Sequence, residues 1–353
     1  MPPTPPRPDE LAGPLLAWFE EARRAMPWRG VDDPYRIWLS EIMLQQTQVA
    51  TVIPYYQRFV ERFPTVDELA AADEDEVLAL WQGLGYYSRA RNLQRAAKLI
   101  ASEHGGEFPR EPAAARALPG VGPYTTGAVL SIAYGVRLPA VDGNTERVLA
   151  RVMGIEGDLS RGPAKRTVHA IAAEAVPDSR PGEFNQAVME LGSTLCSPIS
   201  PCCERCPLES LCVAARTGRT GELPTPTVRP PVERRKAAAA IVRRRGRVLV
   251  VQRPPTGFWA SLWEFPWVDV TNDGDPQGSL VDHVRGHLGL GLTGLAPLGS
   301  LSYGIMNRRY ALTAYGASSR AGRAPAAARW VEPCELAALA MPAPHRKLAE
   351  RIV

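Results

Sequence analysis

Four cysteines within seventeen residues limit the fold of this chain more than any other feature. They follow the pattern Cys196-x6-Cys203-x2-Cys206-x5-Cys212. Thiolates this close together favour zinc or an iron–sulfur cluster. Zinc ribbons usually carry two Cys-x2-Cys pairs, whereas this loop has one such pair between two single cysteines, which favours a [4Fe-4S] cluster. A disulfide framework is the weaker alternative, because the 353-residue chain has only two other cysteines, of which Cys202 breaks the spacing and is interpreted as a bystander.

Length and composition set broader limits. A chain of 353 residues suggests two domains, each able to bury its own core. No apolar run is long enough to cross a bilayer, and the start, MPPTPPRPDE, lacks the apolar segment of a signal peptide. Reduced cysteines without an export signal predict a cytoplasmic location. The net charge of +4 is compatible with a polyanionic partner but does not indicate one.

A proline-rich stretch divides the chain. Residues 221–231 read GELPTPTVRPP, and prolines at this density disfavour a helix and favour an extended linker. Upstream, apolar residues at helical spacing predict helices at 37–46, 66–85, 88–105 and 166–176. Downstream, strand-like runs lie at 237–253, 259–270 and 308–317, the first of them around an Arg-Gly turn. We therefore expect an all-α domain over 1–220, a linker over 221–232 and an α+β domain over 233–353.

A glycine-rich turn lies between two predicted helices in the segment LPGVGPYTTGA, residues 118–128. Gly120 and Gly122 allow a positive φ, and Pro123 fits the first position of a helix. The free amides at such a helix start can bind a phosphate oxygen, so Gly120, Val121 and Gly122 are candidate contacts to a phosphate backbone. An ordinary helix end followed by a proline at the next helix start is the alternative.

The turn and the cysteine loop together resemble the helix-hairpin-helix, iron–sulfur DNA glycosylase superfamily. Within it, the chain is most similar to the adenine DNA glycosylases of the MutY family. The segments that carry this similarity are MPWRG at 26–30, SEIMLQQTQV at 40–49, QGLGYYSRARNL at 82–93, LPGVGPYTTGA at 118–128, AVDGNTERVLAR at 140–151, FNQAVMELG at 184–192 and the cysteine loop. The second domain resembles the Nudix-like C-terminal domain of that family through VLVVQRPPTGFWASLWEFP at 248–266. The resemblance implies a helix-hairpin-helix glycosylase domain whose loop holds the [4Fe-4S] cluster, followed by a Nudix-like domain.

Glu41 is the candidate general acid. On the helix predicted at 37–46 it shares a face with Ile37, Trp38 and Leu44. A carboxyl group among apolar neighbours has a raised pKa, which suits protonation of a leaving purine near neutral pH. For a lone glutamate a solvated helix face is the more common reading, but the resemblance implies that Glu41 protonates N7 of adenine.

Asp142 is the second candidate carboxylate. The segment AVDGNTERVLAR predicts a helix whose N-cap is Asp142 or Asn144. A fixed carboxylate there can also stabilise the positive charge that develops on the sugar during N-glycosidic cleavage. The resemblance implies this role for Asp142 and an orienting role for Asn144.

Tyr124 indicates whether such a glycosylase also cuts the DNA strand. By resemblance, relatives that also cut the DNA strand carry a lysine nucleophile at this position, whereas tyrosine forms no Schiff base. We therefore expect a purely hydrolytic glycosylase, in which Tyr124 hydrogen-bonds near Asp142 or the sugar. Packing of the ring on the helix start is the alternative.

The resemblance also assigns residues that handle the bases. An enzyme that acts on a stacked base must flip it and fill the gap. Gln46 and Tyr86 are expected to wedge into the duplex, with Tyr86 beside the lesion base. Trp28, Arg29 and Gln186 resemble the adenine pocket, although Trp28 and Tyr86 are also ordinary core residues by type.

The second domain is predicted to read DNA without chemistry of its own. The region that corresponds to the Nudix box is DHVRGHLGLGL, which lacks the glutamates that hold magnesium. The resemblance implies that this domain helps to recognise 8-oxoguanine. Alignment on the following strand places Ile305, Met306 and Asn307 at the reading loop, and a shifted alignment places Ser302 and Tyr303 there instead.

The function that the resemblance implies is removal of adenine opposite 8-oxoguanine, and opposite guanine, by a monomeric enzyme acting on double-stranded DNA at the nucleoid. One alternative is a related glycosylase for another base, such as thymine in a G·T mismatch. Another is a catalytically silent protein that binds damaged DNA. Tyr124 and the Nudix-like domain favour the adenine enzyme, and the presence of both Glu41 and Asp142 disfavours the silent protein.

Overall fold

The chain packs as two separate units. The computed structural model describes residues 3–226, 230–270, 274–319 and 325–352, so residues 227–229 of the predicted linker lie outside the described part. The first unit, which we call unit 1, comprises Met1–Ala71 and Asn92–Val228. The second, unit 2, comprises Ala72–Arg91 and Arg229–Val353.

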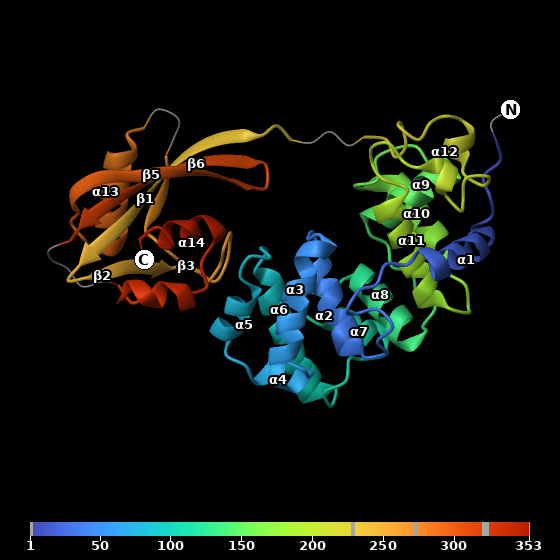
Figure 1. The fold of residues 1–353 in the computed structure, drawn as a ribbon, viewed down its shortest axis with the longest axis horizontal. Coiled ribbons are helices and arrows are strands. Elements are labelled where there is room, and N and C mark those ends of the chain that lie inside the picture. The colour runs from blue at the N-terminus through green and yellow to red at the C-terminus, as the bar shows by residue number, and fades with distance from the viewer. Residues whose placement is uncertain (1–2, 227–229, 271–273, 320–324, 353) are drawn as a thin grey trace. The chain divides into compact units, whose positions relative to one another are not determined.

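Unit 1 is all-α over the residues that the structure describes, as the sequence predicts (Figure 1). Its core joins Phe19, Leu149, Val168 and Leu191, and the cysteine loop packs against the same core through Leu208. The α-helices are α1 (Ala12–Ala22), α2 (Pro34–Leu44), α3 (Val49–Arg62), α4 (Val66–Ala71), α6 (Ser88–Glu103, shared with unit 2), α7 (Pro112–Ala117), α8 (Pro123–Tyr134), α9 (Gly143–Met153), α10 (Gly162–Ala175), α11 (Pro181–Thr194) and α12 (Val213–Arg216), with 3-10 turns at Pro8–Leu11 and Cys203–Arg205.

Two predicted helices differ from the structure at their ends. The helix predicted at 37–46 stops at Leu44, because the chain turns sharply and Gln46 adopts a φ of +59°. The helix predicted at 66–85 is two helices, α4 and α5 (Glu74–Trp81), since Asp73 has an extended backbone and starts the second one.

Unit 2 is built on one mixed sheet. Strands run in the order β3-β2-β1-β6-β5, with β4 paired to β1 and β7 to β2. The central pair β1–β6 is parallel and the other pairs are antiparallel. The bounds are β1 Glu233–Arg244, β2 Arg247–Gln252, β3 Trp263–Glu264, β4 Trp267–Val270, β5 Thr293–Ile305, β6 Arg308–Ser318 and β7 Ala328–Val331, with helices α13 Pro276–Leu288 and α14 Ala343–Ala349 and a 3-10 turn at Pro333–Ala338.

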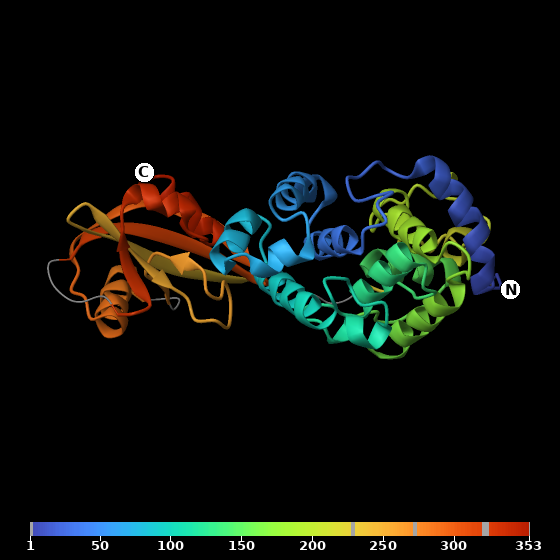
Figure 2. The same ribbon diagram turned by 90° about the horizontal axis from the view of Figure 1, so that it is seen from below.

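Strand β1 has two buried faces, which explains its run of alanines. Ala237, Ala239 and Ile241 pack with residues of α14, whereas the alternate residues, beginning with Ala238 and Ala240, pack with residues of α13. Figure 2 shows the two helices on opposite faces of the sheet. The predicted α+β class is therefore confirmed, with the sheet as the middle layer.

Residues 72–91 precede the predicted linker in sequence but pack with the C-terminal part of the chain. The Tyr87 hydroxyl donates to the Met341 carbonyl at 3.2 Å. Arg91 donates to the Ala260 carbonyl at 2.6 Å. These residues are thus carried by unit 2, although the division predicted at 221–232 groups them with the first domain.

None of the helices in the described part of the chain has both the length and the apolar character that a membrane span requires.

Candidate active site

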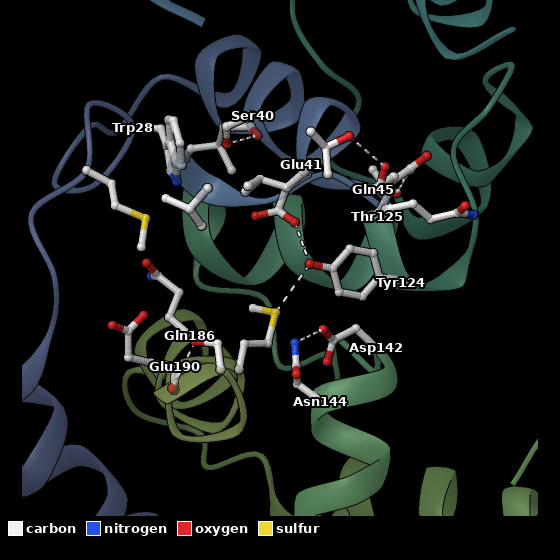
Figure 3. Close-up of a pocket in the computed structure, with 18 of the residues that line it drawn as sticks. Trp28, Ser40, Glu41, Gln45, Tyr124, Thr125, Asp142, Asn144, Gln186 and Glu190 are labelled. Atoms are coloured by element: carbon white, nitrogen blue, oxygen red, sulfur yellow. Dashed lines mark hydrogen bonds between the residues drawn. The ribbon is translucent and has the colours of Figure 1, made fainter. Parts of the chain in front are cut away.

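A deep cavity of about 1020 Å³ lies within unit 1. It is formed by the end of α2 and by the starts of α8 and α9, with α11 closing one side. Figure 3 shows Trp28, Gln186 and Glu190 on one side, Tyr124 and Asp142 on the other, and Glu41 between them. The cavity brings together the following residues that the sequence predicts for the site: Trp28, Arg29, Glu41, Gln46, Gly120, Gly122, Tyr124, Asp142, Asn144 and Gln186.

Glu41 lines this cavity and belongs to α2. Asp33 caps that helix by accepting hydrogen bonds from the Tyr35 and Arg36 amides, which fixes the face on which Glu41 projects. Glu41 is only 6% exposed. Burial raises the pKa of its carboxyl group to about 7, and the charge of Asp142 adds to the rise. The group is therefore protonated in a large share of molecules at neutral pH, which is what a general acid requires.

Tyr124, predicted to hydrogen-bond near Asp142 or the sugar, forms its hydrogen bond with Glu41, and Asp142 is close enough to influence its pKa. Its hydroxyl donates to Glu41 Oε2 at 2.5 Å, and Met189 Sδ lies 3.2 Å from the Tyr124 hydroxyl oxygen. This bond stabilises the carboxylate form and so moderates the rise in the pKa of Glu41. Burial and the neighbouring carboxyl group raise the pKa of Tyr124 well above its ordinary value, so the phenol stays neutral and acts as a donor.

Asp142 is the N-cap of α9 and is held at both oxygens. Its Oδ1 accepts from the Thr145 amide at 2.8 Å, and its Oδ2 accepts from Asn144 Nδ2 at 2.8 Å. Asn144 is fixed in turn, because its Oδ1 accepts from Arg147 at 2.9 Å. Of the two caps that the sequence allows, Asp142 is the one observed, and Asn144 orients it.

Glu190 is a site residue that the sequence reasoning missed. Its side chain is 1% exposed and binds two arginines, Arg24 Nε at 2.5 Å and Arg29 at 2.6 Å. Burial opposes ionisation of Glu190, but the hydrogen bonds from Arg24 and then Arg29 outweigh it and lower its pKa. Glu190 follows Gln186 by four residues, so both lie on one face of α11. This spacing is the sequence signal that could have identified Glu190 as a site residue.

The cavity therefore holds buried carboxyl groups with opposite pKa shifts. That of Glu41 is raised and that of Glu190 is lowered. Trp28 forms the adjoining wall, 7% exposed and packed edge-on against Tyr56 with ring centroids 5.1 Å apart. The side-chain amide of Gln186 already forms one hydrogen bond, in which its Nε2 donates to the Gly182 carbonyl at 3.3 Å. Such a pairing of a proton donor with a fixed anion is typical of acid–base active sites.

The glycine-rich turn has the predicted shape, although only one of its glycines needs a special backbone. Gly120 has a φ of +77°, and a Cβ there would lie 2.8 Å from Asn92 Cβ. Gly122 has an ordinary extended φ of −95° and is the N-cap of α8, which starts at Pro123. The Val121 amide donates to the Leu118 carbonyl at 3.1 Å, so it closes the turn.

The two predicted wedge residues are each held in a strained turn. Gln46 and Tyr86 have φ values of +59° and +47°, which are unfavourable for residues other than glycine. Gln46 lies at the cavity of unit 1, and Tyr86 belongs to unit 2. Tyr86 is 56% exposed, so its ring is not a core residue.

The residues proposed to read the lesion lie on the β5–β6 hairpin of unit 2. Met306 and Asn307 form its tip, where Met306 is 81% exposed with a φ of +52°. Tyr303 lies within β5 and stacks on Tyr310 with centroids 5.2 Å apart, while Ser302 is an exposed residue of the same strand. Of the two alignments, the one with Met306 and Asn307 thus places its residues at the tip.

The four cysteines of the loop line one small cavity beside α9 and α11. Arg151 donates to Cys196 Sγ at 3.4 Å, and backbone amides of Leu208 and Ala214 donate toward Cys206 and Cys212. Burial raises the pKa of the Cys206 thiol to about 12. Within the described ranges, no set of three or more His, Cys, Asp or Glu side chains is close enough to hold a single metal ion.

The sequence matches two families, which lie on either side of the proline-rich stretch. Residues 39–177 match the HhH-GPD superfamily of base excision DNA repair proteins, and residues 237–351 match the NUDIX domain. A thermostable thymine-DNA glycosylase has a similar fold, with a TM-score of 0.55 at 29% identity over 60% of this chain and 97% of that one. The fold and the cavity thus define a helix-hairpin-helix base excision repair protein with an added NUDIX domain.

Curated relatives narrow the class. The adenine DNA glycosylase of Schizosaccharomyces pombe is 34% identical over 74% of this chain and 70% of its own length. The adenine DNA glycosylase of Homo sapiens is 39% identical over 72% of this chain, and the matched region spans 57% of the human protein. The chain belongs to the adenine DNA glycosylase family.

Proposed function

We propose that this protein is a monofunctional adenine DNA glycosylase, which hydrolyses the N-glycosidic bond of adenine paired with 8-oxoguanine or with guanine. The observation that carries the proposal is the pairing, in one cavity, of the buried Glu41 with the fixed Asp142. Relatives named adenine DNA glycosylase match most of the chain.

The chemistry follows from the two carboxyl groups. Glu41 delivers its proton to N7 of a flipped adenine, the bond from C1′ to N9 breaks, and its electrons leave with the base. Asp142 lies where its negative charge stabilises the positive sugar that remains. A water molecule then adds to C1′ and gives up a proton, which restores Glu41.

Tyr124 supports the monofunctional class. A lyase needs an amine that attacks the sugar, and a phenol with a pKa far above neutrality does not supply one. Tyr124 instead sets the acidity of Glu41 through its 2.5 Å hydrogen bond. The DNA strand is therefore left intact at the abasic site.

The surrounding residues fit recognition of the adenine. Arg29 and Glu190 form a fixed ion pair at the cavity wall, and together they offer a donor and an acceptor to the edge of a purine. Trp28 supplies a flat apolar wall next to them. Gln46 is exposed at the rim, where it fills the space of the flipped base.

We propose further that Cys196, Cys203, Cys206 and Cys212 hold a [4Fe-4S] cluster. All four cysteines line one cavity, and N–H groups of the chain donate to three of the sulfur atoms, which is the environment that stabilises cluster thiolates. When bound, the cluster would tie the loop to the core of unit 1. The thiols lie apart from Glu41, so no step of the base release passes through them.

Unit 2 is proposed to read the base opposite the adenine. Its helix α13 has no glutamate and carries Asp282 and the capping Asp275, so this helix does not offer the glutamate cluster that holds magnesium in a Nudix hydrolase. The exposed Met306 at the hairpin tip is flanked by Asn307 and Arg308, which suits insertion next to a base with a cation close to phosphate.

The test is base release from three duplexes, carrying A opposite 8-oxoguanine, A opposite G, and T opposite G. The proposal predicts release of adenine from the first two and strand breakage only after alkali treatment. Release of thymine in preference to adenine would favour the thymine alternative, and breakage without alkali would contradict the monofunctional class.

A further inference from the structure

Tyr86 lies on a turn with an unfavourable backbone conformation. Gly83, Gly85 and Tyr86 have φ values of +107°, +71° and +47°. Glycine tolerates such values, whereas tyrosine is strained in this region. An exposed aromatic ring on a strained turn persists only when neighbouring contacts fix the turn.

Part of the support is local. Trp81 Nε1 donates to the Gly85 carbonyl at 3.1 Å. Arg89 donates to the Leu84 carbonyl at 3.1 Å, and its guanidinium lies over the Tyr86 ring, 5.6 Å from the centroid. These contacts fix the shape of residues 81–89 but do not attach the turn to anything outside it.

The C-terminal residues of unit 2 contact the turn from outside. The Tyr87 hydroxyl, next in sequence to Tyr86, donates to the Met341 carbonyl at 3.2 Å. Arg346 of α14 donates to Gln82 Oε1 at 3.1 Å. The turn is thus held on both flanks, at Gln82 and at Tyr87, by residues that follow the sheet.

The same unit carries Met306 on the β5–β6 hairpin. Tyr86 and Met306 are both large, exposed side chains with a positive φ, and both are proposed to face the lesion base. The adenine cavity, in contrast, is built wholly from residues of unit 1. The residues proposed to contact the adenine therefore belong to unit 1, and those proposed to contact the lesion base belong to unit 2. The proline-rich stretch does not mark this boundary, because Tyr86 precedes it in sequence.

We propose that residues 72–91 and the C-terminal residues act as one lesion-side body, in which Tyr87 and Gln82 are positioning residues for Tyr86. This inference rests on the proposed adenine glycosylase function. The sheet of unit 2 then has two tasks: it presents Met306 directly, and it holds the turn of Tyr86 through Met341 and Arg346.

The test uses the full chain with Tyr87→Phe, Gln82→Leu and the double variant. Tyr87→Phe keeps the buried ring and removes the hydroxyl that donates to Met341. Gln82→Glu keeps an acceptor for Arg346 and serves as the rescue variant. Tyr134→Phe is the matched control, because its hydroxyl also donates to a backbone carbonyl, that of Phe108 in unit 1, at 2.7 Å.

Two readouts are measured. The first is capture of the duplex with A opposite 8-oxoguanine, taken from the protein concentration that gives half-maximal single-turnover rate. Each single variant should weaken capture about fivefold, the factor for loss of one hydrogen bond, with the rate at saturating protein unchanged. The double variant should weaken it further, and Gln82→Glu and Tyr134→Phe should match the wild type.

The second readout needs no activity. Amide hydrogen exchange in the peptide covering residues 82–88 should quicken about fivefold in Tyr87→Phe and stay at the wild-type rate in Tyr134→Phe. Unchanged capture together with unchanged exchange would overturn the positioning role. A wild-type protein that releases no adenine would instead contradict the proposed function, while the exchange experiment would still decide whether Met341 and Arg346 hold the turn.

Discussion

Tyr124→Phe should move the pH dependence of base release in a direction that the structure specifies. The Tyr124 hydroxyl donates to Glu41 Oε2 at 2.5 Å and favours the charged form of that carboxyl group. Phenylalanine keeps the ring in place and removes the donor. Burial then acts on Glu41 with less opposition, so its pKa rises further above about 7.

The size of the effect follows from the energy of the bond. A hydrogen bond to a charged group contributes about 1.5–3 kcal/mol, and one pKa unit corresponds to about 1.4 kcal/mol. Solvent takes up part of the loss, so we expect an upward shift of about one pH unit. Since Glu41 must be protonated to act, the rate of base release falls as pH rises through its pKa. The variant should therefore keep its activity to higher pH than the wild type does.

The assay is the single-turnover rate of adenine release from pH 5 to pH 9 at saturating protein. Only the midpoint of the falling limb matters, so a lower maximal rate does not affect the conclusion. Met189→Leu is the matched control, because it changes the other neighbour of the Tyr124 hydroxyl and leaves the bond to Glu41 intact. A midpoint that stays in place or moves to lower pH in Tyr124→Phe would refute the assignment of Glu41 as the general acid.

Other predictions address the cofactor, the turn and the domain division. Protein from iron-replete cells should contain about four irons per chain, and stoichiometric zinc without sulfide would exclude the cluster. Borohydride should trap almost no covalent adduct with DNA, and efficient trapping would show a lyase. Gly120→Ala should lower stability by roughly 2 kcal/mol, seen as a lower Tm, because of its φ of +77° and the contact with Asn92; an unchanged Tm would contradict the described turn. A chain ending at Thr225 should lose most of its preference for 8-oxoguanine over guanine, since the cut also removes the partners of Tyr87 and Arg91; unchanged discrimination would assign unit 2 another role.

Local features of the site can be predicted from the sequence, because interactions between residues close together in the chain determine them. Apolar neighbours at helical spacing, together with the family resemblance, predict a Glu41 carboxyl group with a raised pKa, and Glu41 is buried with a raised pKa. Asp142 precedes a helical pattern and is its N-cap. Pro123 starts α8, as its fixed φ and missing N–H favour.

Features that depend on contacts between distant parts of the chain could not be predicted from the sequence. Glu190 meets Arg24 across 166 positions of sequence, and Tyr124 meets Glu41 across 83. The spacing of residues along the chain does not predict contacts over such distances. The sequence therefore predicts a hydrogen bond of Tyr124 near Asp142 or the sugar and not the one to Glu41. The grouping of residues 72–91 with unit 2 has the same cause, because the proline-rich stretch marks a break in the chain but not which helices pack on which side of it.

Glu41→Gln tests the central claim most directly. The substitution keeps the shape of the side chain and an acceptor for Tyr124 but removes the proton that adenine must receive. Single-turnover adenine release from a duplex with A opposite 8-oxoguanine should fall by a factor on the order of 10²–10⁴ or more, while binding of that duplex is retained. Release at a rate close to that of the wild type would contradict the claim that this cavity performs acid-catalysed base excision through Glu41.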